Sequence, residues 1–207
     1  MTEIAYPAKL SIDYPDRKLN RLTTFFRAFM VIPIAIILAL LVGMSTNWGD
    51  SGWHAQYGAV GLVFIPTVLM LLFRKKYPKW WFDWNLALTK FIIRVYAYIL
   101  LLRDEYPSTD EEQAVNIDII YPNAQELSRG LPLVKWIMAI PHYIVLAFLS
   151  IAVWVVTIIA WFAILFTGRY PRGMFNFVVD VYRWSLRVTA YAFILVTDKY
   201  PPFSLSA

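Results

Sequence analysis

The sequence predicts an all-α membrane protein made of two tandem repeats, each a transmembrane helical hairpin plus an interfacial amphipathic helix, with short cytoplasmic β-strands before each repeat. Three observations lead to this fold class: the composition, the length of the apolar runs, and the similarity of the two halves of the chain. Of the 207 residues, 59% are hydrophobic and 16% are charged, whereas a soluble domain carries about 25% charged residues.

The basic residues are distributed unevenly along the chain. All 19 lysines and arginines lie in four segments, residues 9–27, 74–103, 129–135 and 169–199. Cytoplasmic loops of membrane proteins carry such an excess of basic residues. The pattern therefore predicts a multi-pass protein of the bacterial cytoplasmic (inner) membrane with both termini in the cytoplasm. It argues against a nucleic-acid surface, because the basic segments alternate with apolar runs of membrane length.

The first half contains two apolar runs that we expect to form a hairpin. As a helix, Leu22–Val42 would reach about 31 Å, enough to cross the hydrocarbon core. After a polar connection, Tyr57–Phe73 would reach about 25 Å, and the three basic residues that follow it can extend to the interface.

The second half contains one longer run, Leu133–Phe166. A single helix of this length would reach about 51 Å, more than a bilayer requires. We therefore expect two helices with a tight reversal near Ser150, although neither Gly nor Pro marks a turn there.

The second half of the sequence repeats the first. "RAFMVIPIAII" at residue 27 aligns with "KWIMAIPHYIV" at residue 135, and "YPKWWFDW" at residue 77 with "YPRGMFNF" at residue 170. The lead-ins "AKLSIDYP" and "VNIDIIYP" alternate apolar and polar residues, as half-buried strands do, and we expect these two strands to meet. The alignment predicts repeat 1 in residues 1–108 and repeat 2 in residues 109–207.

The last element of each repeat carries a narrow charged stripe on a helix rich in aromatic residues. The stripes are Asp83, Ala87, Lys90 and Arg94 in the first copy, and Asn176, Asp180, Arg183 and Arg187 in the second. This pattern is typical of a helix that lies in the membrane interface. A third span in each half is the alternative, but charges in the middle of a span are costly.

Three motifs in the second half resemble an uncharacterised bacterial polytopic membrane-protein family, which is catalogued as a domain of unknown function. They are the "GRYPRG" turn, the "RWSLRVTAY" helix and the "DKYPPFSL" ending. The first half is similar to a diverged copy of the same unit, with "RKKYPKWW" at the turn. The resemblance implies a membrane location and a repeated unit, and it brings no activity, ligand or catalytic residue.

Several residues are candidates for contacts with the membrane. Basic residues near the cytoplasmic ends of the helices can hold lipid headgroups, and the candidates are Arg27, Lys135, Arg94, Arg183 and Arg187. Prolines at matching places in the two halves, Pro33 and Pro141, are expected to kink helices. The Tyr-Pro pairs Tyr77-Pro78 and Tyr170-Pro171 are expected to mark interface turns, with tyrosine at headgroup depth and proline in the first turn of the next helix.

The residue inventory gives no sign of an enzyme. There is no cysteine, no Ser-His-Asp spacing, no histidine-rich cluster and no Gly-rich phosphate loop, so we expect no catalytic residue, cofactor or metal. His142 in the apolar run is either a ligand or a hydrogen-bonded structural histidine, and its isolation favours the latter. The acidic run from Asp104 to Glu112 is expected to be a solvated linker.

These observations predict a non-catalytic protein that acts as an accessory or scaffold subunit of a membrane complex, or in a lipid-contacting assembly. Its expected partners are membrane lipids and a protein within the membrane, either a larger complex or a second copy. The alternative is a transporter or channel for a small solute or lipid, with its path at the repeat or oligomer interface. A polar cavity through the protein would favour that alternative, and a packed apolar centre would count against it.

Overall fold

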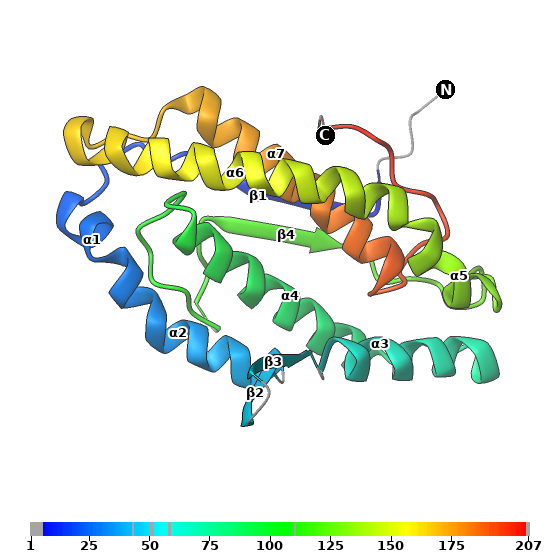
Figure 1. Cartoon of the computed structure of the whole chain (residues 1–207). Helices are drawn as coiled ribbons and strands as arrows, with labels where there is room; N and C mark the ends of the chain where they lie inside the picture. Colours follow the sequence, from blue (N-terminus) through cyan, green and yellow to red (C-terminus); the bar gives the residue numbers. More distant parts are fainter. Residues whose placement is uncertain (1–5, 43, 50–51, 58, 110, 206–207) are drawn as a thin grey trace, which may run out of the picture.

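A computed structural model of the chain describes residues 6–42, 44–49, 52–57, 59–109 and 111–205. Helices dominate the fold, and the strands that it describes form two antiparallel pairs (Figure 1). In chain order the elements are β1 (Ala8–Ile12), α1 (Arg21–Phe25), α2 (Arg27–Val42), β2 (Met44–Gly49), β3 (Gly52–Tyr57), α3 (Ala59–Leu69), the π-helical turn η1 (Met70–Arg74), α4 (Lys79–Ile99), β4 (Val115–Ile119), α5 (Leu131–Met138), α6 (Ile140–Thr167) and α7 (Arg172–Ala192).

The strands β1 and β4 pair antiparallel at the centre of the fold, which confirms that the two lead-ins meet. Leu10 lies opposite Ile117 in the middle of the pair. Successive side chains of a strand point to opposite faces, and here the apolar ones are buried while the polar ones are exposed. The outer face of the pair therefore carries Lys9, Ser11, Asn116 and Asp118.

The inner face of the β1–β4 pair packs into the main hydrophobic core. That core also contains residues of α6, namely Val153, Ala160 and Ile164. Helix α7 packs beside β1 and α4 beside β4, and α6 lies in front of α7 and β1 in Figure 1. The pair thus has α6 on its inner side, and its polar outer face points away from α6.

The expected reversal near Ser150 is absent, because α6 is one continuous helix of 28 residues. Its sequence at this point is apolar and free of Gly and Pro, so nothing interrupts the main-chain hydrogen bonds. The Ser150 hydroxyl donates to the carbonyl of Ala147, one turn earlier, so its hydrogen-bonding need is met within the helix. The second transmembrane hairpin was a wrong prediction.

The first expected hairpin is also absent in the predicted form. The run Leu22–Val42 breaks at Phe26, which separates α1 from α2. The 16 residues of α2 reach about 24 Å, less than the hydrocarbon core. Arg27, the first residue of α2, pairs with Asp104.

Among the described residues, one helical segment is long and apolar enough to cross a membrane, the 37 residues Leu131–Thr167 that comprise α5 and α6. The tandem-hairpin fold class is therefore wrong, and the multi-pass topology with both termini in the cytoplasm has no support in the described residues. The amphipathic helices are placed differently as well. Helix α7 buries eleven of its 21 residues within the protein, so it packs as a core helix.

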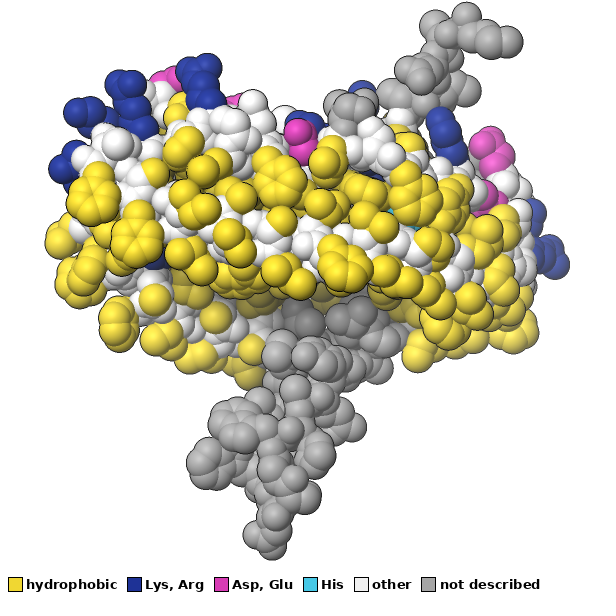
Figure 2. All heavy atoms as spheres, turned by 45° about the horizontal axis from the view of Figure 1, so that its top comes forward, with side chains coloured by type: hydrophobic (Ala, Val, Ile, Leu, Met, Phe, Trp, Pro, Cys, Tyr) yellow, Lys and Arg dark blue, Asp and Glu magenta, His cyan; other side chains and the backbone are white. Residues whose placement is uncertain are grey.

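A broad apolar surface covers the side of the molecule that α6 forms. Large hydrophobic side chains are exposed along α6, and Phe148 and Phe166 are 70% and 78% exposed. Figure 2 shows this surface, with Lys and Arg side chains gathered along its upper edge. Contiguous apolar surface of this kind marks a contact with membrane or protein.

Candidate functional site: a basic groove beside the central strands

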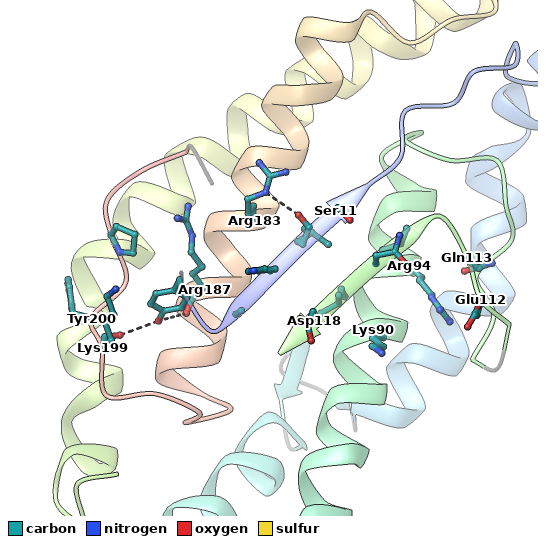
Figure 3. Close-up of a pocket in the computed structure, with 18 residues that line it drawn as sticks. Ser11, Lys90, Arg94, Glu112, Gln113, Asp118, Arg183, Arg187, Lys199 and Tyr200 are labelled. Carbon is teal, nitrogen blue, oxygen red and sulfur yellow. Dashed lines mark hydrogen bonds between the residues drawn. The ribbon is translucent and has the colours of Figure 1, made fainter. Parts of the chain in front are cut away.

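A groove of about 1130 Å³ lies over the outer face of the β1–β4 pair (Figure 3). Its walls come from α4 and α7, and its ends from the segment before β4 and the C-terminal segment. Six cations and two carboxylates line it, giving a formal charge of +4; they are Lys9, Lys90, Arg94, Arg183, Arg187 and Lys199, against Glu112 and Asp118. The groove is therefore suited to an anion.

The α4 wall is formed by Lys90 and Arg94, which lie four residues apart and so share one face of the helix. The Arg94 Nη1 donates to the carbonyl of Ser108 over 2.7 Å, which fixes the guanidinium at the groove. The Arg94 Nε is buried and has no hydrogen-bond partner within the described part of the chain. A buried Nε cannot reach a ligand in the groove, so a contact from Arg94 would come from the Nη atoms of its guanidinium.

The α7 wall is formed by Arg183 and Arg187, again four residues apart. Arg183 Nε donates to the carbonyl of Leu10 over 3.1 Å, and its Nη1 pairs with Asp180. Arg187 donates from Nη2 to the carbonyl of Ser204. Burial, with the nearby charge of Arg183, lowers the pKa of Arg187 from its ordinary value. Main-chain carbonyls thus position both cations.

Tyr6 closes one end of the groove. Its hydroxyl lies within hydrogen-bond distance of two carbonyl oxygens, that of Lys199 at 3.2 Å and that of Arg187 at 3.3 Å. Burial raises the pKa of Tyr6 well above its ordinary value, so the phenol stays protonated and remains a donor at neutral pH. This contact joins the segment before β1 to the C-terminal segment.

Two of the predicted headgroup residues lie away from the groove. Arg27 is 4% exposed and pairs with Asp104 over 2.5 Å, and Lys135 is 0% exposed and pairs with Asp198 over 2.7 Å. Both cations are paired with a carboxylate, and neither lines the groove. The structure brings together the other three candidates, Arg94, Arg183 and Arg187.

The sequence analysis missed the acidic partners. Asp104 was placed in a solvated linker, yet its side chain is 11% exposed. A signal was present, because Asp104 and Asp198 each stand two residues before a Tyr-Pro pair. The two ion pairs also have equivalent aromatic neighbours. The Arg27 guanidinium lies 4.1 Å from the ring centroid of Tyr98, and the Lys135 ammonium lies 5.2 Å from the ring centroid of Tyr191.

The predicted turn and kink residues have structural places in the fold. Pro78 and Pro171 directly precede α4 and α7. The tyrosines before them, Tyr77 and Tyr170, are buried in the core and do not reach the surface. Pro33 lies inside α2, and Pro141 lies in the first turn of α6, where a proline does not interrupt hydrogen bonds. The described prolines Pro33 and Pro141 do not line the groove.

His142 is enclosed beside the C-terminal segment. Its Nδ1 accepts a hydrogen bond from Trp184 Nε1 over 3.1 Å, and the Phe203 ring stacks on the imidazole at a centroid distance of 3.9 Å. Within the described residues, no group of three or more His, Cys, Asp or Glu side chains is placed to hold a metal. A packed, hydrogen-bonded imidazole is the structural role that the sequence favoured.

Part of the chain is similar to a known protein family. Residues 132–204 match the model of a domain of unknown function, DUF4389. The DUF4389 segment contains α6, α7 and the α7 wall of the groove, and it ends at Ser204, which accepts from Arg187. The α4 wall and the β1–β4 pair lie outside it. No curated protein and no solved structure matches the chain.

Proposed function

We propose that this chain is a non-catalytic membrane protein that contacts the bilayer through the apolar surface of α6 and binds a phosphate-type anion in the basic groove. The observation that carries the proposal is the convergence of Lys90, Arg94, Arg183 and Arg187 from two helices on one groove. Arginine in particular matches the geometry of phosphate oxygens, because its planar fork can donate two parallel hydrogen bonds.

The arrangement of the two surfaces supports a role at a membrane surface. The apolar side chains of α6 lie on one side of the β1–β4 pair and the groove on the other. A protein that buries the α6 side in the bilayer would hold the groove toward water. By the enrichment of basic residues in cytoplasmic segments, we assign the groove to the cytoplasmic side of a bacterial inner membrane.

Binding, as opposed to catalysis, is the role that the groove supports. Its arginines are fixed by main-chain carbonyls, an arrangement that holds charge in place for a ligand. Transport lacks a supporting observation, since the floor of the groove is a strand pair whose inner face packs into the apolar core. We therefore propose an accessory or scaffold protein that holds an anionic ligand at the membrane, alone or beside a partner within the bilayer.

Vesicle flotation and thermal unfolding test the two halves of this proposal. After detergent removal, the protein should float with phosphatidylcholine vesicles, and Phe148→Glu on the α6 surface should reduce the floating fraction. Thr109→Glu adds the same charge in an exposed loop and should leave flotation unchanged. In detergent, inorganic phosphate should raise the unfolding temperature more than chloride at equal ionic strength. Lys90→Gln should reduce this stabilisation by phosphate. The proposal would be contradicted if Phe148→Glu floated as well as the wild type and phosphate stabilised Lys90→Gln as much as the wild type.

A further inference from the structure

We propose that the groove binds a single molecule with two phosphate groups joined by a hydroxylated bridge, one phosphate at Lys90 and Arg94 and the other at Arg183 and Arg187. This inference rests on the proposed function, because it names the ligand class of the same groove.

The separation of the two basic pairs is the first argument. Arg183 and Arg187 stand on the β1 side of the strand pair, and Lys90 and Arg94 on the β4 side (Figure 3). Two paired strands are about 5 Å apart, and each helix lies beyond its strand. Figure 3 shows the labelled side chains of the two pairs on opposite sides of the strands, so the groove offers two basic positions.

The floor between the two pairs is polar, which suits one bridged ligand better than two separate ions. Ser11 and Asn116 are direct cross-strand neighbours on the outer face, and so are Lys9 and Asp118. Their hydroxyl, amide, ammonium and carboxylate groups offer both donors and acceptors. Hydroxyl groups on a bridge between two phosphates can bond to this row of side chains.

Charge and size point to the same ligand. The groove carries a formal charge of +4, or +3 when Asp180, which pairs with Arg183, is included. A phosphate monoester carries about −1.5 to −2 at neutral pH, so two of them carry about −3 to −4. The volume of about 1130 Å³ slightly exceeds the range of about 300–1,000 Å³ that is typical of small-molecule sites, so the groove has room for a whole small molecule.

Two sources could supply this chemistry: a soluble sugar or polyol bisphosphate, or a lipid headgroup with two phosphates joined by glycerol. The outer face of the strand pair points away from the apolar surface of α6, which places the groove toward water. The experiment therefore uses a soluble probe first and lets lipid compete with it.

Isothermal titration calorimetry of the whole chain in detergent tests the inference with fructose 1,6-bisphosphate and fructose 6-phosphate. We expect the bisphosphate to bind at least about tenfold more tightly than the monophosphate, because only the bisphosphate reaches both basic pairs. Lys90→Gln should remove most of this preference and leave weak binding of either ligand. Lys79→Gln, on the same helix but outside the groove, should retain it, and circular dichroism should show that both variants fold.

The outcomes separate the inference from the proposed function. Equal affinity for the two sugar phosphates, or an undiminished preference in Lys90→Gln, would overturn the two-phosphate ligand while leaving an anion site. Binding of neither sugar phosphate, with no stabilisation by inorganic phosphate, would overturn both. With the preference established, vesicles that contain cardiolipin should displace the bisphosphate if the source is a lipid, with phosphatidylglycerol vesicles of equal phosphate content as control. Failure of both vesicle types to displace it assigns the site to a soluble bisphosphate.

Discussion

The ammonium of Lys135 lies 2.7 Å from a carboxylate oxygen of Asp198, and the lysine side chain is fully buried while the aspartate is partly exposed. The same ammonium donates to the carbonyl of Thr197 over 2.7 Å. The pair ties α5 to the segment that follows α7. Because the lysine is the more deeply buried partner, removal of the carboxylate would leave its charge in the interior without a counterion or access to water.

Removal of the Asp198 carboxylate should therefore be strongly destabilising. In Asp198→Ala the Lys135 charge stays buried without its counterion, and we expect a loss of about 3–5 kcal/mol in the free energy of unfolding. Lys135→Met combined with Asp198→Ala should recover much of that loss, because no charge is then left in the interior. Denaturant unfolding in detergent measures both. A loss below about 0.5 kcal/mol in the single variant would show that the pair does not hold this junction.

The same carboxylate predicts a pH dependence at the acidic end. Burial opposes ionisation of Asp198, but hydrogen bonds from Lys135 and Ser128 outweigh it and hold the pKa of the carboxyl below its ordinary value. A lowered pKa stabilises the folded state fully above the unfolded-state pKa, which is about 3.9. That stability is lost as the pH falls from there through the lower folded-state pKa. The unfolding temperature of the wild type should thus fall more steeply than that of Asp198→Asn between about pH 4 and pH 2, as thermal scans across this range would show.

The continuity of α6 can be tested at Ser150. A proline in the middle of a helix removes a main-chain hydrogen bond and clashes with the preceding turn, at a cost of about 3 kcal/mol. Ser150→Pro should therefore destabilise the protein strongly, whereas Ser150→Ala should be neutral or slightly stabilising, since alanine favours helix. A tight reversal at this position would instead tolerate the proline, so equal unfolding temperatures of the two variants would restore the hairpin.

The turn between α6 and α7 depends on one glycine. Gly168 ends α6 with φ of +73°, in the left-handed region, and a Cβ there would make ordinary contact with Lys18 at 3.5 Å. The cost of Gly168→Ala should thus come from backbone conformation and amount to about 1–2 kcal/mol. Gly173 lies at the start of α7 with open space around it, so Gly173→Ala should be neutral or stabilising. Thermal unfolding of both variants in the same detergent gives the comparison, and an equal effect of the two substitutions would contradict it.

The individual strands and helices that form the groove could be predicted from the sequence, but the way in which they pack together could not. Alternation in the two lead-ins gave β1 and β4, and the spacing of Lys90 with Arg94 and of Arg183 with Arg187 placed each pair on one helical face. The two charged stripes line a common groove because α7 packs beside β1 and α4 packs beside β4. Periodicity within one element does not contain that information.

The errors in the predicted helical hairpins have a physical origin as well. The length and hydropathy of an apolar run do not reveal long-range ion pairs or a division of the run into separate helices. The first apolar run is divided at Phe26, and Arg27, directly after the break, pairs with Asp104, 77 residues later in the sequence. The long run in the second half contains no such residue at its centre, so α6 continues through Ser150.

The pairing of β1 with β4 also constrains the order in which the chain can fold. Leu10 emerges from the ribosome long before its partner Ile117, and among the described strands only β4 pairs with β1. Until residue 119 is synthesised, the amides and carbonyls of β1 are open to other chains, as those of any unpaired edge strand are. Contacts between residues so far apart in sequence also form slowly. The groove can therefore be completed only late in synthesis, and a chain arrested before β4 would carry an exposed strand and half of a binding site.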